Sequence, residues 1–331
     1  METFASLVVR FVPPSSLATT FVLALATLFT GCADESGETP SKPLIVVTTT
    51  HLSDLVRTIS GDRSEVTALM GPGVDPHLYK PTSRDLSSLS KADLIIYHGL
   101  LLEGRMGEAL EQAEQKGIPT LAAASGIPAS MLISDAGDDN SHGNVDPHVW
   151  FSTQAWTACL NTVTERLVEL EPSSAEVFRQ NALLMQREIA KVGDWARERI
   201  NEIPEDKRKL VTSHDAFRYL GRDLGLKVIG LQGISTNVEA GLADRANLVE
   251  FIVSQEIPAI FIESSVNPGA MREIARESKV LIGGELFSDA LGPPGERISG
   301  PGEESHGLDT WSGTMIHNVS TIVEALSVKP Q

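Results

Sequence analysis

Short, continuous apolar runs alternate with helical patterns along this chain, and this alternation limits most strongly what it can fold into. Such runs, bounded by Gly, Pro or polar residues, are typical of strands that are buried on both faces of a parallel sheet. The candidates are 44–48, 66–70, 94–97 and 119–123 in the first half, and 210–212, 227–231, 259–262 and 280–282 in the second. Because helical patterns fill the gaps, the chain is predicted to form βα units in an α/β fold with two parallel sheets.

One long stretch without proline separates the two sets of strands. It runs from Ser173 to Ile203, and Ser173-Ser174 form a favourable N-cap. Its apolar residues recur near helical spacing: Val177, Leu184, Ile189, Val192, Trp195 and Ile200. About 30 residues at a rise of 1.5 Å make a rod of roughly 45 Å. We therefore expect two parallel-sheet α/β domains that are joined by one long rigid helix.

The domain boundaries follow from these patterns. The predicted parts are a lipoprotein signal peptide at 1–31, a tether at 32–42, an N-terminal α/β domain at 43–171, a linking helix at 172–203 and a C-terminal α/β domain at 204–331. The tether is expected to be flexible because it is short and polar.

The N-terminal residues predict export. The run from Leu17 to Phe29 is apolar and uncharged, but it is too short to span a bilayer comfortably, which takes roughly 20 residues. It fits the hydrophobic region of a signal peptide. The small residues before Cys32 resemble a bacterial lipobox, although Phe29 stands where that motif usually has Leu. We expect a lipid on Cys32 that anchors the exported protein to the membrane, and a plain cleaved signal peptide is the alternative.

Composition and charge exclude some partners. The apolar fraction of 41% and the charged fraction of 21% are those of a globular protein. The formal net charge of −17 argues against nucleic acid, because neutralising phosphates needs clustered Lys and Arg. Such a charge is compatible with a cationic cargo, and it is also common in proteins that are acidic for solubility alone.

The tripeptide Asp-Pro-His occurs twice, ending at His77 and at His148. Each proline fixes a backbone angle and removes a donor, so each imidazole is carried on a stiffened loop. His214 and Asp289 follow strand candidates of the second half. Ligands of open α/β sheets bind beyond the carboxyl ends of the strands. With two candidates from each half, these four side chains are predicted to hold one metal ion between the domains.

The ligand types suit a first-row divalent ion. Imidazole favours zinc, and a carboxylate also admits manganese or iron. Binding requires unprotonated histidines, so it should weaken as the pH falls towards their ordinary pKa of about 6.5. Each ligating histidine also needs an acceptor for its other ring nitrogen, which the sequence does not identify.

Three other histidines lie near these motifs. His51 and His98 stand at the ends of strand candidates, where either one is a supporting group or a replacement ligand for Asp289. His142 lies in an acidic loop at 135–143. That loop either gathers metal or is simply solvated.

Four segments in order resemble the metal-ligand motifs of the zinc/manganese-binding proteins of bacterial ABC importers. They are Gly71-Pro-Gly-Val-Asp-Pro-His-Leu-Tyr, Asp146-Pro-His-Val-Trp, Thr212-Ser-His-Asp-Ala-Phe and Leu286-Phe-Ser-Asp-Ala-Leu-Gly. The resemblance covers roughly residues 43–328. It implies two α/β domains on one long helix and a cleft in which His77, His148, His214 and Asp289 bind the ion. Members with Glu at the third position look more like manganese binders, so His214 favours zinc.

The resemblance also implies the function. The chain is expected to be an extracytoplasmic solute-binding protein, not an enzyme, that delivers Zn²⁺ or Mn²⁺ to an ABC permease, and a monomer is the simplest expectation. A metal-dependent hydrolase is one alternative, although His-Glu-x-x-His and Gly-x-Ser-x-Gly are absent. A surface adhesin with a structural metal is another. The sequence does not decide between zinc, manganese and iron, and it does not identify the permease.

Overall fold

A computed structural model describes residues 42–134 and 145–327. The predicted signal peptide, most of the predicted tether with Cys32, and the loop around His142 lie outside the described residues. The described residues belong to one compact unit that starts at Lys42. In this part of the chain no helix is both long and apolar enough to cross a membrane.

The N-terminal half is built on a parallel sheet of four strands, ordered β2-β1-β3-β4. The strands are β1 (Leu44–Val47), β2 (Glu65–Ala68), β3 (Leu94–Tyr97) and β4 (Thr120–Ala122). Ile45, Val46 and Val47 of the inner strand β1 are fully buried, because both faces of this sheet are covered. This explains the continuous apolar runs in the sequence.

Helices cover the two faces of this sheet. The side chains of Ile45 and Val47 pack with α1 (Thr50–Ser60) and α4 (Thr153–Leu170). Val46 points to the other face, where it packs with α2 (Ser83–Leu89) and α3 (Gly107–Gln115). The alternation follows the two-residue period of a strand.

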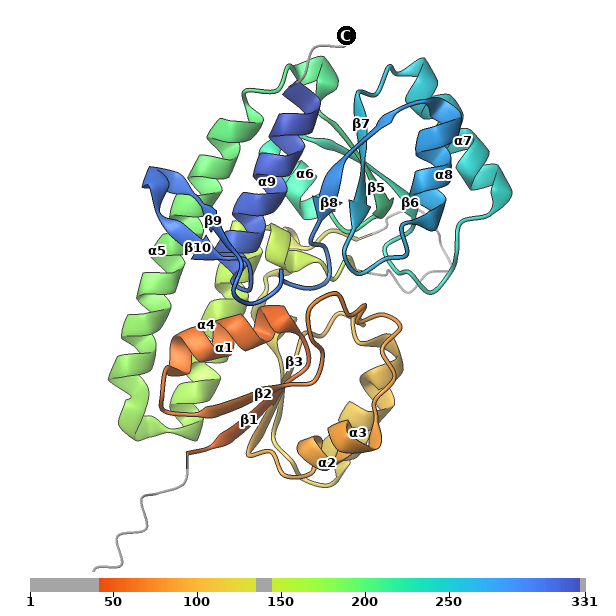
Figure 1. The fold of residues 1–331 in the computed structure, drawn as a ribbon. Coiled ribbons are helices and arrows are strands. Elements are labelled where there is room, and N and C mark those ends of the chain that lie inside the picture. The colour runs from red at the N-terminus through yellow and green to blue at the C-terminus, as the bar shows by residue number, and fades with distance from the viewer. Residues whose placement is uncertain (1–41, 135–144, 328–331) are drawn as a thin grey trace, which may run out of the picture. The chain divides into compact units, whose positions relative to one another are not determined.

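The C-terminal half repeats this architecture. β5 (Lys209–His214) pairs in parallel with β6 (Lys227–Gln232), and β7 (Ala259–Glu263) pairs in parallel with β8 (Leu281–Leu286). β5 and β7 lie side by side (Figure 1). The helices are α6 (Arg218–Leu224), α7 (Leu242–Ser254), α8 (Gly269–Ser278) and α9 (Trp311–Ser327). An antiparallel hairpin of β9 (Arg297–Ser299) and β10 (Ser305–Gly307), which the sequence patterns did not predict, precedes α9.

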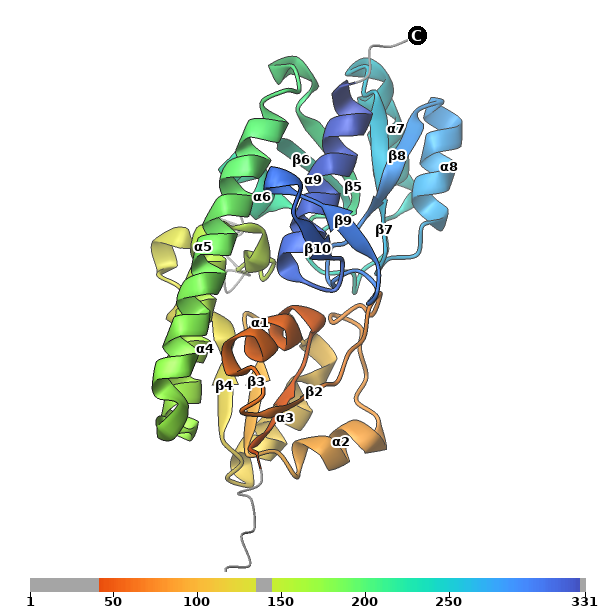
Figure 2. The same cartoon turned by 60° about the vertical axis from the view of Figure 1, so that its left-hand side comes forward.

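The predicted long helix is confirmed as α5 (Ala175–Ile200), with 26 residues and a length of about 39 Å. It packs against α1 and α4 of the N-terminal half and against α9 of the C-terminal half. Figures 1 and 2 show it running alongside both halves. A short 3₁₀ turn, Pro172–Ser174, connects it to α4.

Two details of the prediction for this helix were wrong. Ser174 occupies the N-cap position but makes no capping hydrogen bond with its side chain, and the Ser173 hydroxyl donates to Glu171. Leu184 is 61% exposed, because it lies off the buried face. That face carries Phe178, Ala182, Met185, Ile189, Val192, Ala196 and Ile200, spaced alternately by three and four residues or nearly so.

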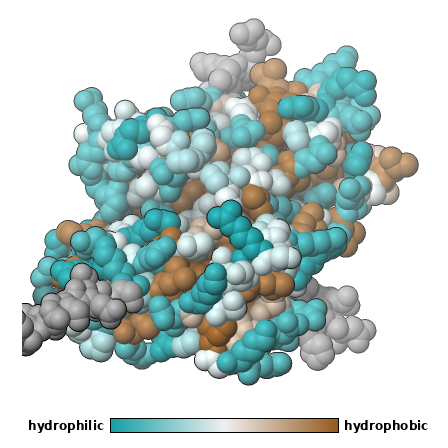
Figure 3. All heavy atoms as spheres, turned by 60° about the horizontal axis from the view of Figure 1, so that its bottom comes forward, coloured by the Kyte–Doolittle hydropathy of each residue, from teal (hydrophilic) through white to brown (hydrophobic). Residues whose placement is uncertain are grey.

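The surface carries both hydrophobic and hydrophilic side chains. On the face shown in Figure 3, hydrophobic residues appear in small groups among hydrophilic ones. Cys159 is buried and forms no disulfide, as expected for a small core residue.

Candidate metal centre

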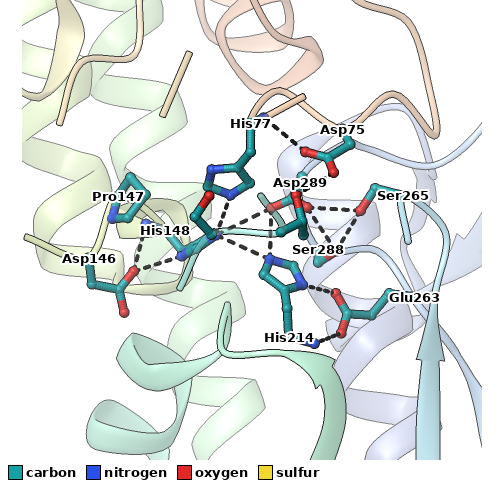
Figure 4. A network of polar contacts seen from close by, with 12 residues as sticks. Asp75, His77, Asp146, Pro147, His148, His214, Glu263, Ser265, Ser288 and Asp289 are labelled. Atoms are coloured by element: carbon teal, nitrogen blue, oxygen red, sulfur yellow. Dashed lines mark hydrogen bonds and ion pairs between the residues drawn. The ribbon is translucent and has the colours of Figure 1, made fainter. Parts of the chain in front are cut away.

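The four predicted ligands come together at one point. Each of His77, His148, His214 and Asp289 offers a ligand atom, and these atoms all lie within 4.8 Å of one another (Figure 4). All four side chains are buried. Two of them come from the N-terminal half and two from the C-terminal half, so the centre lies where the halves meet.

Most of the distances between these atoms suit a tetrahedral ion. The Nε2 atom of His148 lies 3.4 Å from Nε2 of His77, 3.4 Å from Nε2 of His214 and 3.3 Å from Oδ1 of Asp289. Nε2 of His214 lies 3.4 Å from the same Oδ1. Zinc bonds of 2.0–2.1 Å in a tetrahedron would hold neighbouring ligand atoms about 3.3 Å apart. Four of the six distances therefore have the length of a zinc tetrahedron's edges.

Loops and strand ends deliver the ligands. His77 lies in the loop after β2, and His148 lies just before the 3₁₀ turn Val149–Phe151 that leads into α4. His214 is the last residue of β5, not a residue beyond it as predicted, because β5 stays paired with β6 as far as Gln232. Asp289 follows the end of β8 by three residues.

Asp146 orients the imidazole of His148. Its Oδ1 accepts the His148 Nδ1–H at 2.7 Å and the His148 backbone N–H at 3.0 Å. The contact places the Nδ1 proton towards Asp146 and turns Nε2 to the centre. Burial lowers the pKa of His148, but the carboxylates of Asp146 and Asp289 together outweigh burial, and the pKa is raised. The proximity of Asp146 could have been inferred from the sequence, since it stands two residues away across a proline.

Glu263 forms a close ion-pair contact with His214. Its Oε2 lies 2.6 Å from Nδ1 of His214, and its Oε1 accepts the His214 backbone N–H at 2.9 Å. Burial opposes the charged imidazole, yet Glu263 and then Asp289 raise its pKa well above 6.5. Glu263 ends β7 beside β5. Sequence reasoning missed it because strand candidates do not reveal which strands are neighbours.

Asp289 presents a free anionic oxygen. Its Oδ2 accepts a hydrogen bond from Ser265 at 2.9 Å, whereas its buried Oδ1 has no hydrogen-bond donor among the described residues. Burial raises the pKa of this carboxyl, but His214 and His148 outweigh burial and hold it well below 3.8. An anionic oxygen beside three imidazole nitrogens is a donor set that fits a divalent cation.

His51 and His98 lie near this centre but outside the group of four. His51 stacks on Trp150 with ring centroids 4.5 Å apart, and in the described structure neither of its ring nitrogens has a hydrogen-bond partner. His98 Nε2 lies 2.7 Å from the Pro147 carbonyl, so it supports the His148 loop. The indole N–H of Trp150 donates to the Ser288 carbonyl at 2.9 Å.

Comparison with known proteins identifies the family. The family described as "zinc-uptake complex component A periplasmic", ZnuA, matches residues 45–325. The chain belongs to this family. The sequence resemblance to zinc/manganese-binding proteins is thereby confirmed.

The relatives of this ZnuA-family chain are named for binding two different metals. It is 39% identical over 318 residues to the zinc-binding protein TroA of Treponema pallidum, with 94% of this chain and 97% of TroA covered. It is 38% identical over 313 residues to the manganese-binding lipoprotein MntA of Bacillus subtilis, with 92% of this chain and 97% of MntA covered. The choice of ion therefore does not follow from the names.

Solved structures show the same fold. The TroA structure from Treponema pallidum superimposes with a TM-score of 0.80 at 38% identity, and covers 87% of this chain and all of TroA. A second structure is that of a manganese-bound periplasmic metal-binding protein from Candidatus Liberibacter asiaticus, mutated at a serine. It has a TM-score of 0.73 at 25% identity, and the match covers 86% of this chain and all of that protein. These similarities agree with the predicted pair of α/β halves on one long helix.

Proposed function

We propose that this protein is the extracytoplasmic binding component of an ABC importer. It captures one divalent transition metal ion between its two α/β halves and delivers it to a membrane permease. The observation that carries the proposal is the meeting of four buried ligand atoms, two from each half, within 4.8 Å. The family to which the chain belongs supports it independently.

The proposed ligands are Nε2 of His77, His148 and His214, and Oδ1 of Asp289. Asp146 and Glu263 occupy the other ring nitrogens of two of these histidines. In metal sites such acceptors fix the ring orientation and make the ligand nitrogen more basic.

Zinc is the proposed cargo, with manganese as the second choice. A set of three imidazoles and one carboxylate suits Zn²⁺ in a tetrahedral site, whereas Mn²⁺ prefers oxygen ligands in six-coordinate sites. The distances of 3.3–3.4 Å around His148 support this preference.

Capture and delivery follow from the position of the site. An ion held by both halves links the proposed domains at 43–171 and 204–331, and the helix at 172–203 limits how far they can move apart. Any force that separates the halves weakens the site, which gives a docked permease a way to release the ion. A lipid on Cys32 would keep the protein, as a monomer, beside that permease.

The ligand set distinguishes this function from its rivals. A catalytic zinc keeps three protein ligands and an open position for water, whereas here four buried ligand atoms surround the centre. The absorption spectrum of a Co²⁺ derivative without an exchangeable water supports a carrier over a hydrolase. Exchange of the metal with a chelator within minutes, without unfolding, supports a carrier over an adhesin with a structural metal.

Elemental analysis of the full-length protein tests the proposal. We expect about one zinc ion per chain in the wild type and a large loss in His148→Ala. His317→Ala is the control, because this histidine of α9 contacts the carbonyl of Glu285 in β8 and lies outside the group of four. Unchanged metal content in His148→Ala contradicts the ligand assignment.

A further inference from the structure

The carboxylate of Asp75 connects the loop of one metal ligand to the opposite half of the protein. Its Oδ1 accepts the backbone N–H of His77 at 2.8 Å (Figure 4). Its Oδ2 accepts the hydroxyl of Thr236 at 2.6 Å. Thr236 is 7% exposed and lies in the loop between β6 and α7. A single side chain therefore joins the His77 loop of the N-terminal half to a loop of the C-terminal half.

His77 lacks the support that the other two histidines have. His148 and His214 each direct Nδ1 to a buried carboxylate, but in the described part of the chain the His77 ring makes no such ion pair. The direction of Nε2 in His77 therefore depends on the backbone of its loop, which Asp75 holds.

Further contacts place this loop against the C-terminal half. Gly73 has φ 71°, and a side-chain carbon added to it would lie 3.5 Å from the Ser264 carbonyl oxygen. The hydrogen bond from Thr236 to Asp75 makes a second contact, with the loop after β6. The His77 loop thus has neighbours from two loops of the opposite half, those that follow β6 and β7.

We propose that Thr236 is a positioning residue for the metal ligand His77. Its hydroxyl holds Asp75, and Asp75 holds the His77 backbone, so the fourth coordination bond reaches full strength only when the β6–α7 loop is in place. This inference rests on the proposed metal-binding function and adds a consequence to it. Displacing the β6–α7 loop would weaken the bond to His77 and leave His148 and His214 in place. Release of the ion can therefore start at this loop.

Two substitutions of Thr236 separate the hydroxyl from the shape of the side chain. Thr236→Val keeps the shape and removes the donor, whereas Thr236→Ser keeps the donor. The control is Thr164→Val in α4, because Thr164 is 4% exposed and its hydroxyl donates to the Leu160 carbonyl at 2.7 Å, away from the site. Zn²⁺ affinity is measured by competition with a chelator, and the dissociation rate is measured by transfer of zinc to an excess of it.

We expect Thr236→Val to weaken zinc binding roughly tenfold, the lower end of what groups supporting a ligand contribute. Most of the loss should appear as faster release. Thr236→Ser and Thr164→Val should keep wild-type affinity. Adding Thr236→Val to Asp75→Ala should change nothing further, because the hydroxyl then has no carboxylate to hold.

The visible spectrum of the Co²⁺-loaded protein reports on the coordination geometry itself. We expect the bands of Thr236→Val to shift from those of the wild type in the direction of His77→Ala, a change that a general loss of stability does not produce. A wild-type protein that binds neither Zn²⁺ nor Co²⁺ overturns the proposed function. A wild type that binds tightly, together with a Thr236→Val variant of unchanged affinity, release rate and spectrum, overturns only the role of Thr236. Equal losses in Thr236→Val and Thr236→Ser also overturn it.

Discussion

The three proposed histidine ligands differ in their pKa values. His148 and His214 are paired with buried carboxylates that raise their pKa values. The pKa of His77, in contrast, is lowered to about 4, chiefly because burial disfavours its charged form. Burial therefore favours a neutral His77 in the metal-free centre, whereas the carboxylates favour the protonated forms of the other two histidines, with which a metal ion competes.

Glu263→Gln tests the carboxylate behind His214. The amide keeps an oxygen for the backbone N–H but removes the negative charge that makes Nε2 a stronger ligand. We expect zinc affinity to fall by roughly 10- to 100-fold, measured by competition with a chelator. Glu285→Gln is the matched control, since Glu285 is an exposed residue of the neighbouring strand β8. Equal affinities in the two variants would show that Glu263 does not support the ligand.

Proton release should accompany metal binding. Because the pKa values of His148 and His214 are raised in the metal-free protein, a metal ion competes with protons at both, and affinity should rise with pH until both have lost them. Calorimetric titration in two buffers of different ionisation enthalpy measures the number released. A heat of binding that is independent of the buffer contradicts this account.

The same shifts predict how stability depends on pH. The raised pKa values stabilise the metal-free fold below the unfolded-state pKa of about 6.5, and this contribution is lost as the pH rises through the higher folded-state values. Metal binding strengthens over the same range. The difference in melting temperature between the zinc-loaded and metal-free protein should therefore widen from about pH 6 to pH 8, and a difference that narrows would contradict the assigned shifts.

His51 makes the fold sensitive to acid. Burial lowers its pKa to about 3, so the folded state excludes a proton that the unfolded state binds below about pH 6.5. At pH 5 this costs about 2 kcal/mol of folding free energy. The variant His51→Phe keeps an aromatic ring against Trp150. Between pH 7.5 and pH 5, its free energy of unfolding should fall by about 2 kcal/mol less than that of the wild type. Denaturant titrations at both pH values measure the difference, and parallel losses in both proteins contradict it.

At the scale of elements, the long helix α5 closely approaches the start of α4, the helix that follows the His148 loop. Gly193 of α5 makes this approach possible, because a side-chain carbon at that position would lie 2.6 Å from Cγ2 of Thr153. Threonine is branched at Cβ and cannot easily turn away. The spacing of α4 and α5 behind the metal centre thus depends on one hydrogen atom in place of a methyl group.

Gly193→Ala should destabilise the protein by about 1–3 kcal/mol, although alanine alone would favour a helix by about 1 kcal/mol. Adding Thr153→Ser removes the clashing methyl group and should restore stability. Gly107→Ala at the start of α3 is the control, because an added carbon there meets no neighbour within 4 Å. Denaturant unfolding measures all four proteins. A Gly193→Ala variant as stable as the wild type would contradict the importance of this close approach between α4 and α5.

The sequence predicted those features that depend on local pattern. Buried strands such as β1 and β5 appear as apolar runs, and the paired Asp-Pro-His motifs indicated His77 and His148. The sequence pattern does not show which strands are neighbours in a sheet. The contact between Glu263, at the end of β7, and His214, at the end of β5, was therefore not predicted. The contact between Asp75 and Thr236 also joins residues 161 positions apart, and no local signal marks such a pair.

At the scale of the whole molecule, the described residues after Ser41 form one compact unit, with a long helix beside both halves and the proposed cation between them. A ligand that binds only the folded state stabilises it by mass action, by about 4.1 kcal/mol at a free concentration of a thousand times Kd. A chelator should therefore lower the melting temperature. Far-ultraviolet circular dichroism should stay unchanged at 25 °C, because the cores of both halves are built without the ion. Unfolding on chelation contradicts a carrier.

Anomalous diffraction from crystals of the zinc-loaded protein tests the central claim most directly. We predict one strong peak that disappears when data are collected below the zinc absorption edge. Its position should be about 2.0–2.1 Å from Nε2 of His77, His148 and His214 and from one carboxylate oxygen of Asp289. A peak elsewhere, or one in bonding contact with fewer than these four side chains, contradicts the proposed site.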